Sequence, residues 1–334
     1  AMDNIFWIAS MTKPVTSLAA LMLAEEGLLV LSEPIITYLP EFSELMVMAD
    51  DVSQKLEPPR AIPTVQDLLR HTSGLTYGQF NEGPVADAYG AANVYDFTST
   101  NAEMADRLAT LPLMHQPGTC FEYGMSTDLL GHLVEVVSGQ TLEGFVKERI
   151  MGPIGANDTK FGLEPSQRHR VADFPNAMKG MDLIPPVHMK PSWFSGGGGL
   201  WSTAEDYMRF AKLLLAEGRV GNSQLVSPFT IRHMMSNHLP PNVRFGLYTP
   251  ELGITSPDPS MGQGFGLGLA VRLETGRNPV PGSVGDVFWP GVSGTNFWID
   301  PGQDLAVVFM AHAAPWRSLH RSALRQLVYQ SLAD

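Results

Sequence analysis

The sequence of 334 residues contains a single cysteine, Cys120, and few charged residues. One cysteine excludes an internal disulfide framework and a metal site made of several cysteines. Lys and Arg total 22 against 34 Asp and Glu, which gives a formal net charge of −12. Because no run of basic residues occurs, neither nucleic acid nor an anionic membrane surface is an expected partner. No apolar run reaches the roughly 18 residues of a membrane span.

Apolar residues are plentiful. Hydrophobic residues make up 44% of the chain, which also contains 32 glycines and 26 prolines. This composition can fill a large core, so a disordered chain is excluded. The glycine and proline content weighs against a coiled coil or a helical repeat and favours a mixed fold with many loops.

The start of the sequence carries no targeting signal. Ala1-Met2-Asp3 leads directly into an apolar segment of strand type at Ile5–Ala9, and no signal peptide precedes it. An abrupt start leaves open whether the true N-terminus is missing. The compartment is therefore undetermined, with the cytoplasm as the favoured expectation.

Apolar side chains recur with helical spacing from Met11 to Gly27. Pro14 falls inside this pattern, and proline is tolerated only in the first turn of a helix. The helix must therefore begin near Ser10, and Gly27 stands where a C-terminal cap belongs.

The remaining chain divides into a helical part and a later part rich in strands. Further helices are predicted at Thr64–Leu69, Ala102–Leu111, Ser126–Ser138 and Leu142–Ile150, from Ser202 or Thr203 to Glu217, and at Trp316–Leu332. Strands in succession, which favour an antiparallel meander, are predicted at Gly264–Leu273, Val284–Trp289, Thr295–Ile299 and Leu305–Ala311. Glycines alternate at strand period from Gly262 to Gly268, which predicts that the helix after Ser10 packs against them.

Several common catalytic motifs are absent. The sequence has no G-x-S-x-G elbow, no H-E-x-x-H zinc motif and no glycine pattern of a nucleotide-binding loop. No cluster of His, Asp and Glu shows metal-ligand spacing, so neither a metal nor a cofactor is expected.

Ser10 and Lys13 remain as candidates for chemistry. Three residues apart on a helix, they lie on one face, so the hydroxyl and the amine can reach a common point. A serine hydroxyl needs a base to become a nucleophile, and a lysine withdrawn from water helps to supply one. The alternative is a helix-capping serine followed by a surface lysine, and the pair alone does not exclude it.

The surroundings of this pair resemble the serine β-lactamase-like superfamily. The segments that are similar to its landmarks follow one another in the family order: Phe6–Thr16 around the nucleophile, Leu68–Leu75, Gln116–Gly131 with Tyr123, Gly197–Thr203 and Phe297–Pro301. The resemblance extends from Ile5 to the C-terminal helix. Within the superfamily, the sequence looks most like the family VIII carboxylesterases, which have a class C β-lactamase-like fold.

The resemblance implies an α/β (α+β) fold in which helices flank an antiparallel sheet and a mostly helical domain is inserted. Residues 1–60 and 177–334 are expected to form the α/β domain and residues 61–176 the helical domain, with the active site in the cleft between them. Members of the superfamily usually carry strands ahead of the nucleophile segment, whereas nine residues precede Ser10. Either the sequence given is short, or its sheet is covered differently.

The resemblance also implies roles for individual residues. Ser10 would be the nucleophile, and Tyr123 or Lys13 would take its proton, with the lysine lowering the pKa of the phenol. The backbone N–H groups of Ser10 and Val292 would form the oxyanion hole. His71 is expected to be structural and Asp128 a turn or cap residue.

Trp289-Pro290-Gly291 stands where β-lactamases carry Lys-Thr/Ser-Gly and family VIII esterases carry Trp-Gly-Gly. Trp289, Gly291 and Met125 are therefore the expected substrate-binding residues. Pro290 cannot donate a ladder hydrogen bond, so the strand should be irregular there. Because neither Trp289 nor Met125 offers the polar contacts of a β-lactamase, a pocket without a cation is expected, suited to an uncharged ester.

The expected function is hydrolysis of small-molecule carboxylic esters through a Ser10 acyl-enzyme, with weak β-lactam hydrolysis beside it. One alternative is a β-lactamase, D-amino-acid peptidase or acyltransferase on the same scaffold. The other is a catalytically inactive binding or assembly protein, against which the intact Ser10, Lys13 and Tyr123 argue. The oligomeric state does not follow from the sequence.

Overall fold

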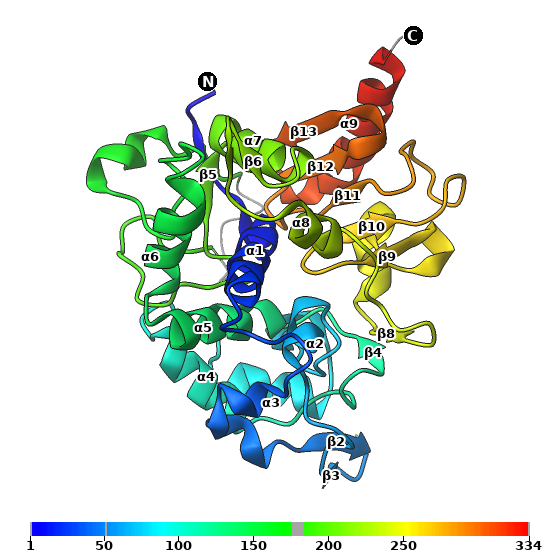
Figure 1. Cartoon of the computed structure of the whole chain (residues 1–334). Helices are drawn as coiled ribbons and strands as arrows, with labels where there is room; N and C mark the ends of the chain where they lie inside the picture. Colours follow the sequence, from blue (N-terminus) through cyan, green and yellow to red (C-terminus); the bar gives the residue numbers. More distant parts are fainter. Residues whose placement is uncertain (1, 51, 176–183, 333–334) are drawn as a thin grey trace.

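The computed structural model describes residues 2–50, 52–175 and 184–332. The helix that follows Ser10, α1 (Thr12–Glu25), passes through the middle of the molecule in Figure 1. All its residues from Thr12 to Leu23 are buried, as expected for a helix with apolar residues on every side. Pro14 lies in its first turn, and Gly27 has a φ of 76° just past its end, so both terminus predictions are confirmed.

Most of the helical part lies below α1 in Figure 1, with α6 beside α1 on the left. Its elements are β2 (Val47–Asp50), β3 (Lys55–Glu57), α2 (Val65–Leu69), α3 (Pro84–Ala91), α4 (Asn101–Ala109), β4 (Cys120–Phe121), α5 (Ser126–Ser138) and α6 (Leu142–Val146). The predicted helix α5 has the bounds expected from the sequence, and it packs directly against α1. Beyond α6 the chain continues as a π-helical turn over Lys147–Met151, so the predicted α-helix to Ile150 is too long.

The second part contains the main sheet. Its elements are β5 (Trp201–Thr203), α7 (Ala204–Leu215), β6 (Arg219–Val220), β7 (Ser223–Gln224), α8 (Pro228–Met234), β8 (Arg244–Phe245), β9 (Gln263–Phe265), β10 (Ala270–Arg272), β11 (Val287–Phe288), β12 (Asn296–Asp300), β13 (Leu305–Phe309) and α9 (Arg317–Ser331). Five of the described strands form an antiparallel sheet in the order β13-β12-β11-β10-β9. The expected boundary between residues 176 and 177 lies outside the described residues.

Helices cover both faces of this sheet. Neighbouring residues of a strand point to opposite faces, and β12 shows it with two aromatic side chains. The ring of Phe297 lies 5.0 Å from that of Tyr207 in α7, and the ring of Trp298 stacks on Tyr329 in α9 at 6.4 Å. The expected fold, an antiparallel sheet flanked by helices, is confirmed.

Two strand predictions are wrong in extent. The stretch Gly264–Leu273 is a hairpin of β9 and β10, because Gly268, with a φ of 89°, lets the chain turn back. Of the four alternating glycines, Gly268 alone has α1 among its nearest neighbours, and a Cβ there would overlap the Ser17 hydroxyl. The strand predicted at Val284–Trp289 is β11, which spans two residues and ends before Pro290, where irregularity was expected.

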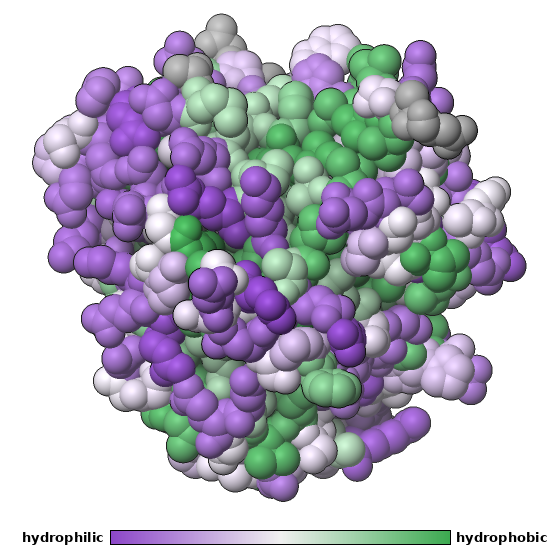
Figure 2. All heavy atoms as spheres, turned by 45° about the horizontal axis from the view of Figure 1, so that its top comes forward, coloured by the Kyte–Doolittle hydropathy of each residue, from purple (hydrophilic) through white to green (hydrophobic). Residues whose placement is uncertain are grey.

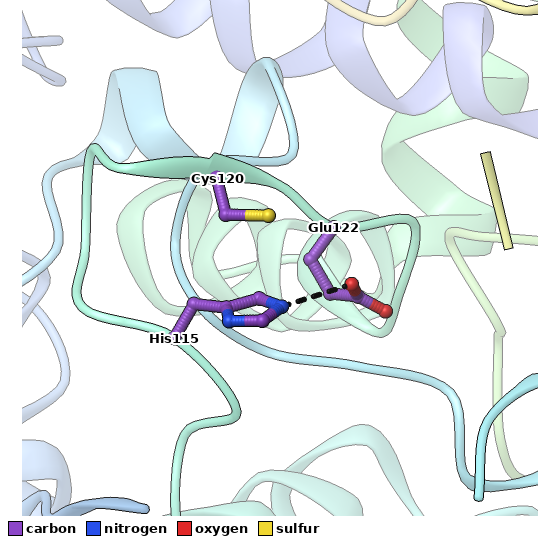
Figure 3. A group of neighbouring side chains, drawn as sticks. All are labelled: His115, Cys120 and Glu122. Carbon is purple, nitrogen blue, oxygen red and sulfur yellow. Dashed lines mark ion pairs between the residues drawn. The ribbon is translucent and has the colours of Figure 1, made fainter. Parts of the chain in front are cut away.

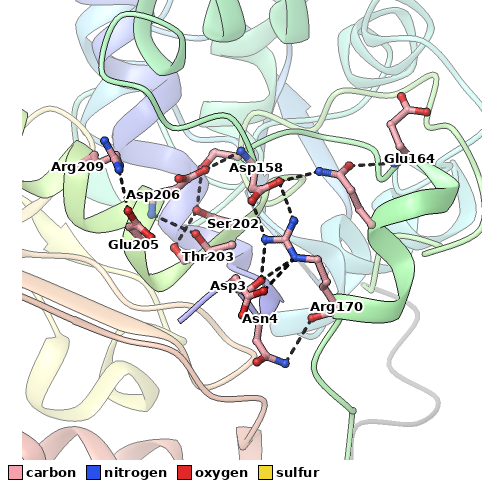
Figure 4. Close-up of polar contacts among 12 residues, drawn as sticks. Asp3, Asn4, Asp158, Glu164, Arg170, Ser202, Thr203, Glu205, Asp206 and Arg209 are labelled. Carbon is pink, nitrogen blue, oxygen red and sulfur yellow. Dashed lines mark hydrogen bonds and ion pairs between the residues drawn. The ribbon is translucent and has the colours of Figure 1, made fainter. Parts of the chain in front are cut away.

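A polar cluster fixes the segment that leads to Ser10. β1 (Ile5–Trp7) pairs antiparallel with β5, and Arg170 joins the chain ahead of it to a loop of the helical part. The guanidinium of Arg170 donates to the backbone oxygen of Asp3 at 2.8 Å and to the carboxylate of Asp158 at 2.6 Å (Figure 4). β1 is thereby tied down on both sides.

The outer surface carries an apolar area. Figure 2, with the top of Figure 1 turned forward, shows apolar side chains gathered on this face between polar regions. Trp316, Leu319 and Leu327, in and beside α9, are each 62% exposed. None of the helices in residues 2–50, 52–175 and 184–332 is long and apolar enough to cross a membrane.

A buried ion cluster attaches α9 to the sheet. The carboxylate of Asp286 accepts from Arg272 of β10 at 2.9 Å and from Arg325 of α9, and Asp286 is 0% exposed. We expect Asp286→Ala to lower the free energy of unfolding by about 3–5 kcal/mol, because two buried guanidinium groups lose their counter-charge. Urea denaturation measures this loss.

The matched control for that variant is Glu274→Ala, which removes an exposed ion pair with Arg277. An exposed pair contributes about 0–1 kcal/mol. Equal effects of the two substitutions would show that Asp286 is not what attaches α9.

Candidate active site

Ser10 sits in a tight turn between β1 and α1. The turn, Ala9–Met11, is a 3-10 helix, and Ala9 has a φ of 48°, a left-handed conformation that costs energy for a residue with a Cβ. Thr12 holds the turn from below: its hydroxyl donates to the Ala9 oxygen at 2.7 Å and accepts from the Leu200 N–H at 3.1 Å. Strain of this kind persists only where the surroundings enforce it, and here it presents Ser10 at the helix N-terminus.

Tyr123 lies between β4 and α5 and reaches Ser10 from the helical part. The two hydroxyl oxygens are 2.7 Å apart in a hydrogen bond, although 113 residues separate them. The buried ring of His71 packs against the Tyr123 ring at 5.1 Å. Burial and the nearby Lys13 hold the pKa of His71 well below 6.5, so it packs as a neutral group.

Lys13 is fully buried beneath Tyr123. Its Nζ donates to the Gly197 oxygen at 2.7 Å and to the Tyr77 hydroxyl at 3.0 Å, and it lies 4.6 Å from the centroid of the Tyr123 ring. Burial lowers the pKa of Lys13 to about 7, while the charge of Asp128 opposes the shift. The amine can therefore change its charge near neutral pH.

Asp128 anchors this lysine rather than capping a turn, so that interpretation is wrong. Its carboxylate is 1% exposed and accepts from Ser195 Oγ at 2.5 Å, Gly197 N at 3.0 Å and Tyr77 Oη at 3.3 Å. Burial raises the pKa of Asp128, and the charge of Lys13 opposes this rise. The network joins α1, α5 and the chain around Gly197 across the molecule.

The phenol of Tyr123 differs from the expectation. Burial raises its pKa above the usual 10, and its hydrogen bond with Ser10 only partly offsets this. The lowered pKa expected from the lysine is therefore wrong, because removal from water outweighs the hydrogen bonds that favour the phenolate. In the resting site Tyr123 is a neutral phenol.

The chain from Trp289 to Thr295 lies directly against the segment ahead of Ser10. Ser293 Oγ donates to the Trp7 oxygen at 2.9 Å, and a Cβ on Gly291 would overlap Thr295 Oγ1 and come within 2.5 Å of the Ile8 oxygen. Among the described residues, no hydrogen bond uses the backbone N–H of Val292. A free N–H beside Ser10 suits an anionic oxygen.

Ser10 and Tyr123 open into a cleft of about 740 Å³, its open mouth included. Besides Tyr123, the wall contains eight aromatic residues from both parts of the chain: Trp7, Tyr77, Phe80, Tyr95, Phe97, Trp193, Tyr248 and Trp289. Trp289 is 1% exposed and contacts the Tyr123 ring at 5.3 Å. Met125 and Gly291 are not part of this wall, and Met125 is completely buried.

The cleft wall also contains two cations, Arg317 and Arg321 of α9. The expectation of a pocket without a cation is therefore wrong. The third motif lacks a lysine, but a helix far along the chain brings guanidinium groups to the same cavity.

The sequence matches the Beta-lactamase family over residues 2–330. The chain belongs to the beta-lactamase family. An uncharacterised protein of Mycobacterium tuberculosis is 36% identical over 332 residues, which cover 96% of this chain and 80% of that protein. Lovastatin esterase of Penicillium rubens is 30% identical, covering 92% of this chain and 79% of that protein.

Other family relatives are named as esterases and as acyltransferases. Among solved structures, EstCE1, a hydrolase with promiscuous acyltransferase activity, superposes with a TM-score of 0.80 and 24% identity, covering 98% of this chain and 86% of that chain. At this identity the likeness supports the fold alone. An enzyme of the serine hydrolase fold is consistent with all these relatives.

In this member of the beta-lactamase family, sequence reasoning missed Tyr77, Asp128 and the two arginines. Tyr77 follows the recognised Leu68–Leu75 segment by two residues, and Asp128 lies inside the recognised Gln116–Gly131 segment, so the signal for each was its position at a motif. Arg317 and Arg321 carried no motif. Their spacing of four places them on one face of α9, and that was the signal available.

The fold also brings together a group of side chains that the sequence did not suggest. His115, Cys120 and Glu122 place ligand-type atoms within 4.8 Å of one another (Figure 3). His115 Nε2 contacts the Glu122 carboxylate at 3.3 Å. Burial and the charge of Glu122 raise the pKa of the Cys120 thiol to about 12. A metal binds the thiolate, so this protonated thiol is poorly prepared to hold one.

The geometry predicts how Lys13 titrates. In protein labelled with ¹³C at lysine Cε, we expect the Lys13 resonance to titrate near pH 7, the value set by its burial. Asp128→Asn should move this midpoint to lower pH, because it removes the negative charge that favours the ammonium form. His71 stays neutral in this range and adds no competing charge.

The exposed Lys147 is the internal control for that measurement, because its resonance should not respond to Asp128→Asn. A Lys13 midpoint that does not respond to Asp128→Asn would mean that the two groups are not coupled.

Proposed function

We propose that this chain is a serine carboxylesterase of the family VIII type, which hydrolyses small-molecule esters through an acyl-enzyme on Ser10. The proposal rests on one observation: the Tyr123 and Ser10 hydroxyl oxygens are 2.7 Å apart in the wall of a cleft, above a buried lysine. Family relatives named as esterases support the reaction class.

In the first step, Ser10 Oγ forms a bond to the ester carbonyl carbon. Its proton passes to the Tyr123–Lys13 pair. Tyr123 contacts Ser10 directly. Lys13, whose pKa is about 7, is partly uncharged at neutral pH. The carbonyl oxygen becomes an anion held by the N–H groups of Ser10 and Val292. The carbon–oxygen bond to the alcohol then breaks, and the alcohol leaves with the proton.

In the second step, water attacks the acyl-enzyme by the same route. The water gives one proton to the Tyr123–Lys13 pair, its oxygen bonds to the acyl carbon, and Ser10 leaves with that proton. The products are a carboxylic acid and free Ser10. Each step uses the same anion site and the same proton relay.

Trp289 favours an ester over a β-lactam. Its buried indole occupies the place where β-lactamases carry a lysine, and it packs on the rings of Tyr123 and Phe265 at 5.3 and 5.1 Å. The aromatic wall suits apolar acyl or alcohol groups. We therefore propose ester hydrolysis as the main reaction and β-lactam hydrolysis as a weak one.

Acyl transfer is the second candidate. Relatives of this chain are named as methylbutanoyltransferases, at 29% identity over 92% of the chain. Transfer shares the Ser10 acyl-enzyme and differs only in the acceptor, an alcohol in place of water. Product analysis with a primary alcohol added to the assay separates the two reactions.

Substitutions at the hydroxyl pair test the mechanism. With p-nitrophenyl butyrate as substrate, Ser10→Ala should lower kcat/KM by about 10⁴-fold or more. Tyr123→Phe should lower it by about 10²–10⁴-fold, the usual contribution of a proton-transfer group. Steady-state release of p-nitrophenol measures both, and nitrocefin turnover by the same samples measures β-lactam hydrolysis.

Tyr248→Phe is the matched control, because Tyr248 lines the same cleft and stacks on Tyr123 without a hydrogen bond from its own hydroxyl to any described residue. Its activity should stay near that of the parent. If Tyr123→Phe also retained full activity, the proposed proton route would be wrong.

Covalent labelling tests whether the site is active at all. A p-nitrophenyl phosphonate should add one phosphonyl group to the parent chain and none to Ser10→Ala, because the activated hydroxyl attacks phosphorus as it attacks carbon. Intact-mass measurement detects the adduct. An unlabelled parent, under conditions that label a control esterase, would favour the inactive binding protein.

A further inference from the structure

Arg321 stands apart from the other buried arginines. Arg272, Arg321 and Arg325 are 1%, 6% and 6% exposed. Two of the three, Arg272 and Arg325, contact the carboxylate of Asp286, which attaches α9 to the sheet. No carboxylate lies within 4.0 Å of the Arg321 guanidinium among the described residues. A buried charge without a counter-charge is costly, so the absence of a carboxylate partner for Arg321 needs an explanation.

The hydrogen bonds of Arg321 leave most of its donors unused. Nη2 donates to the Gly291 oxygen at 2.6 Å, and the buried Nε has no partner. A guanidinium offers five donors in a planar fork that matches a carboxylate. Of these, one is engaged in a hydrogen bond to a described residue.

Arg321 lies where its unused donors can reach a substrate bound in the cleft. Arg321 lines the same cleft as Ser10, together with Arg317 one turn earlier on α9. Burial and the like charge of Arg317 lower the pKa of Arg321 to about 9, which still leaves it charged at neutral pH. Glu251 also lines the cleft, is exposed, and forms no ion pair with either arginine.

We propose that Arg321, assisted by Arg317, binds a carboxylate of the substrate, so that the esters this site prefers carry a free carboxylate group. The inference rests on the proposed esterase function and gives it a substrate class. The carboxylate would supply the counter-charge that the protein itself does not give to Arg321. It would lie beside the Gly291–Val292 backbone, close to the oxyanion site.

Two matched ester pairs test the preference. Mono-(p-nitrophenyl) adipate and p-nitrophenyl hexanoate differ by a carboxylate on the acyl side. 3-Butyryloxybenzoate and 3-butyryloxybenzamide differ by a carboxylate on the alcohol side. The parent chain should favour the acidic member of at least one pair by about tenfold or more in kcat/KM, the effect of one charge-assisted contact.

Arg321→Gln should remove this preference. We expect KM for the acidic ester to rise about 10- to 100-fold, with little change for its neutral partner. Arg219→Gln, at an exposed position on β6, makes the same change in net charge and should leave both rates as in the parent. Arg321→Lys, which keeps the charge but not the fork, should recover part of the affinity.

A merely structural role for Arg321 would look different. Its bond to the Gly291 oxygen holds the chain next to Val292, so losing only that bond would lower kcat equally for acidic and neutral esters. Equal losses would overturn the proposal. So would a parent chain that cleaves neutral esters with no preference for the acidic ones, a result that leaves the esterase function intact.

Inhibition of the parent chain gives a readout that needs no variant. Adipate should compete with p-nitrophenyl hexanoate, its neutral diamide should not, and added salt should weaken the effect because it screens the ion pair. Equal inhibition by acid and diamide would contradict the proposal. If the parent cleaved no ester and took no phosphonate label, the esterase function itself would be what failed.

Discussion

The ammonium group of Lys13 is enclosed by protein, and much of the candidate site follows from that burial. Removing a cation from water is costly unless polar groups replace the water. Here the Gly197 oxygen and the Tyr77 hydroxyl do so, and Asp128 accepts hydrogen bonds from the Gly197 N–H and from the Tyr77 hydroxyl. Because the partners come from α5, from the loop at Tyr77 and from the chain around Gly197, satisfying one lysine fixes the two parts of the molecule against each other.

The same burial sets the chemistry of the hydroxyl pair. It lowers the pKa of Lys13 and raises that of Tyr123, so both groups are closer to neutral than they would be in water. An uncharged amine accepts a proton and an ammonium group donates one, and a lysine with a pKa near 7 is present in both forms at neutral pH. The turn at Ala9, which has a positive φ, sets the position of Ser10, and the Val292 N–H makes no hydrogen bond to a described residue.

The positive charge in the cleft comes from a different element than in the β-lactamases, where a lysine of the third motif supplies it. By sequence resemblance Trp289 stands at the position of that lysine, and in the structure α9 brings Arg317 and Arg321 to the cleft. Lys13 has a buried counter-charge in Asp128, whereas Arg321 has none among the described residues. The ion cluster at Asp286 holds α9 against the sheet, so the position of these arginines depends on packing far from Ser10.

Local signals in the sequence were sufficient for α1 and α5, because Pro14, Gly27 and a long apolar pattern fix a helix through short-range sterics and periodicity. They were also sufficient to nominate Ser10, Lys13 and Tyr123 through the family resemblance. They failed for the hairpin at Gly268, because an alternating pattern does not show where a chain turns back. The pKa of Tyr123, the anchoring role of Asp128 and the cations from α9 were decided only by tertiary structure, since burial and approach between distant segments are properties of the folded chain as a whole.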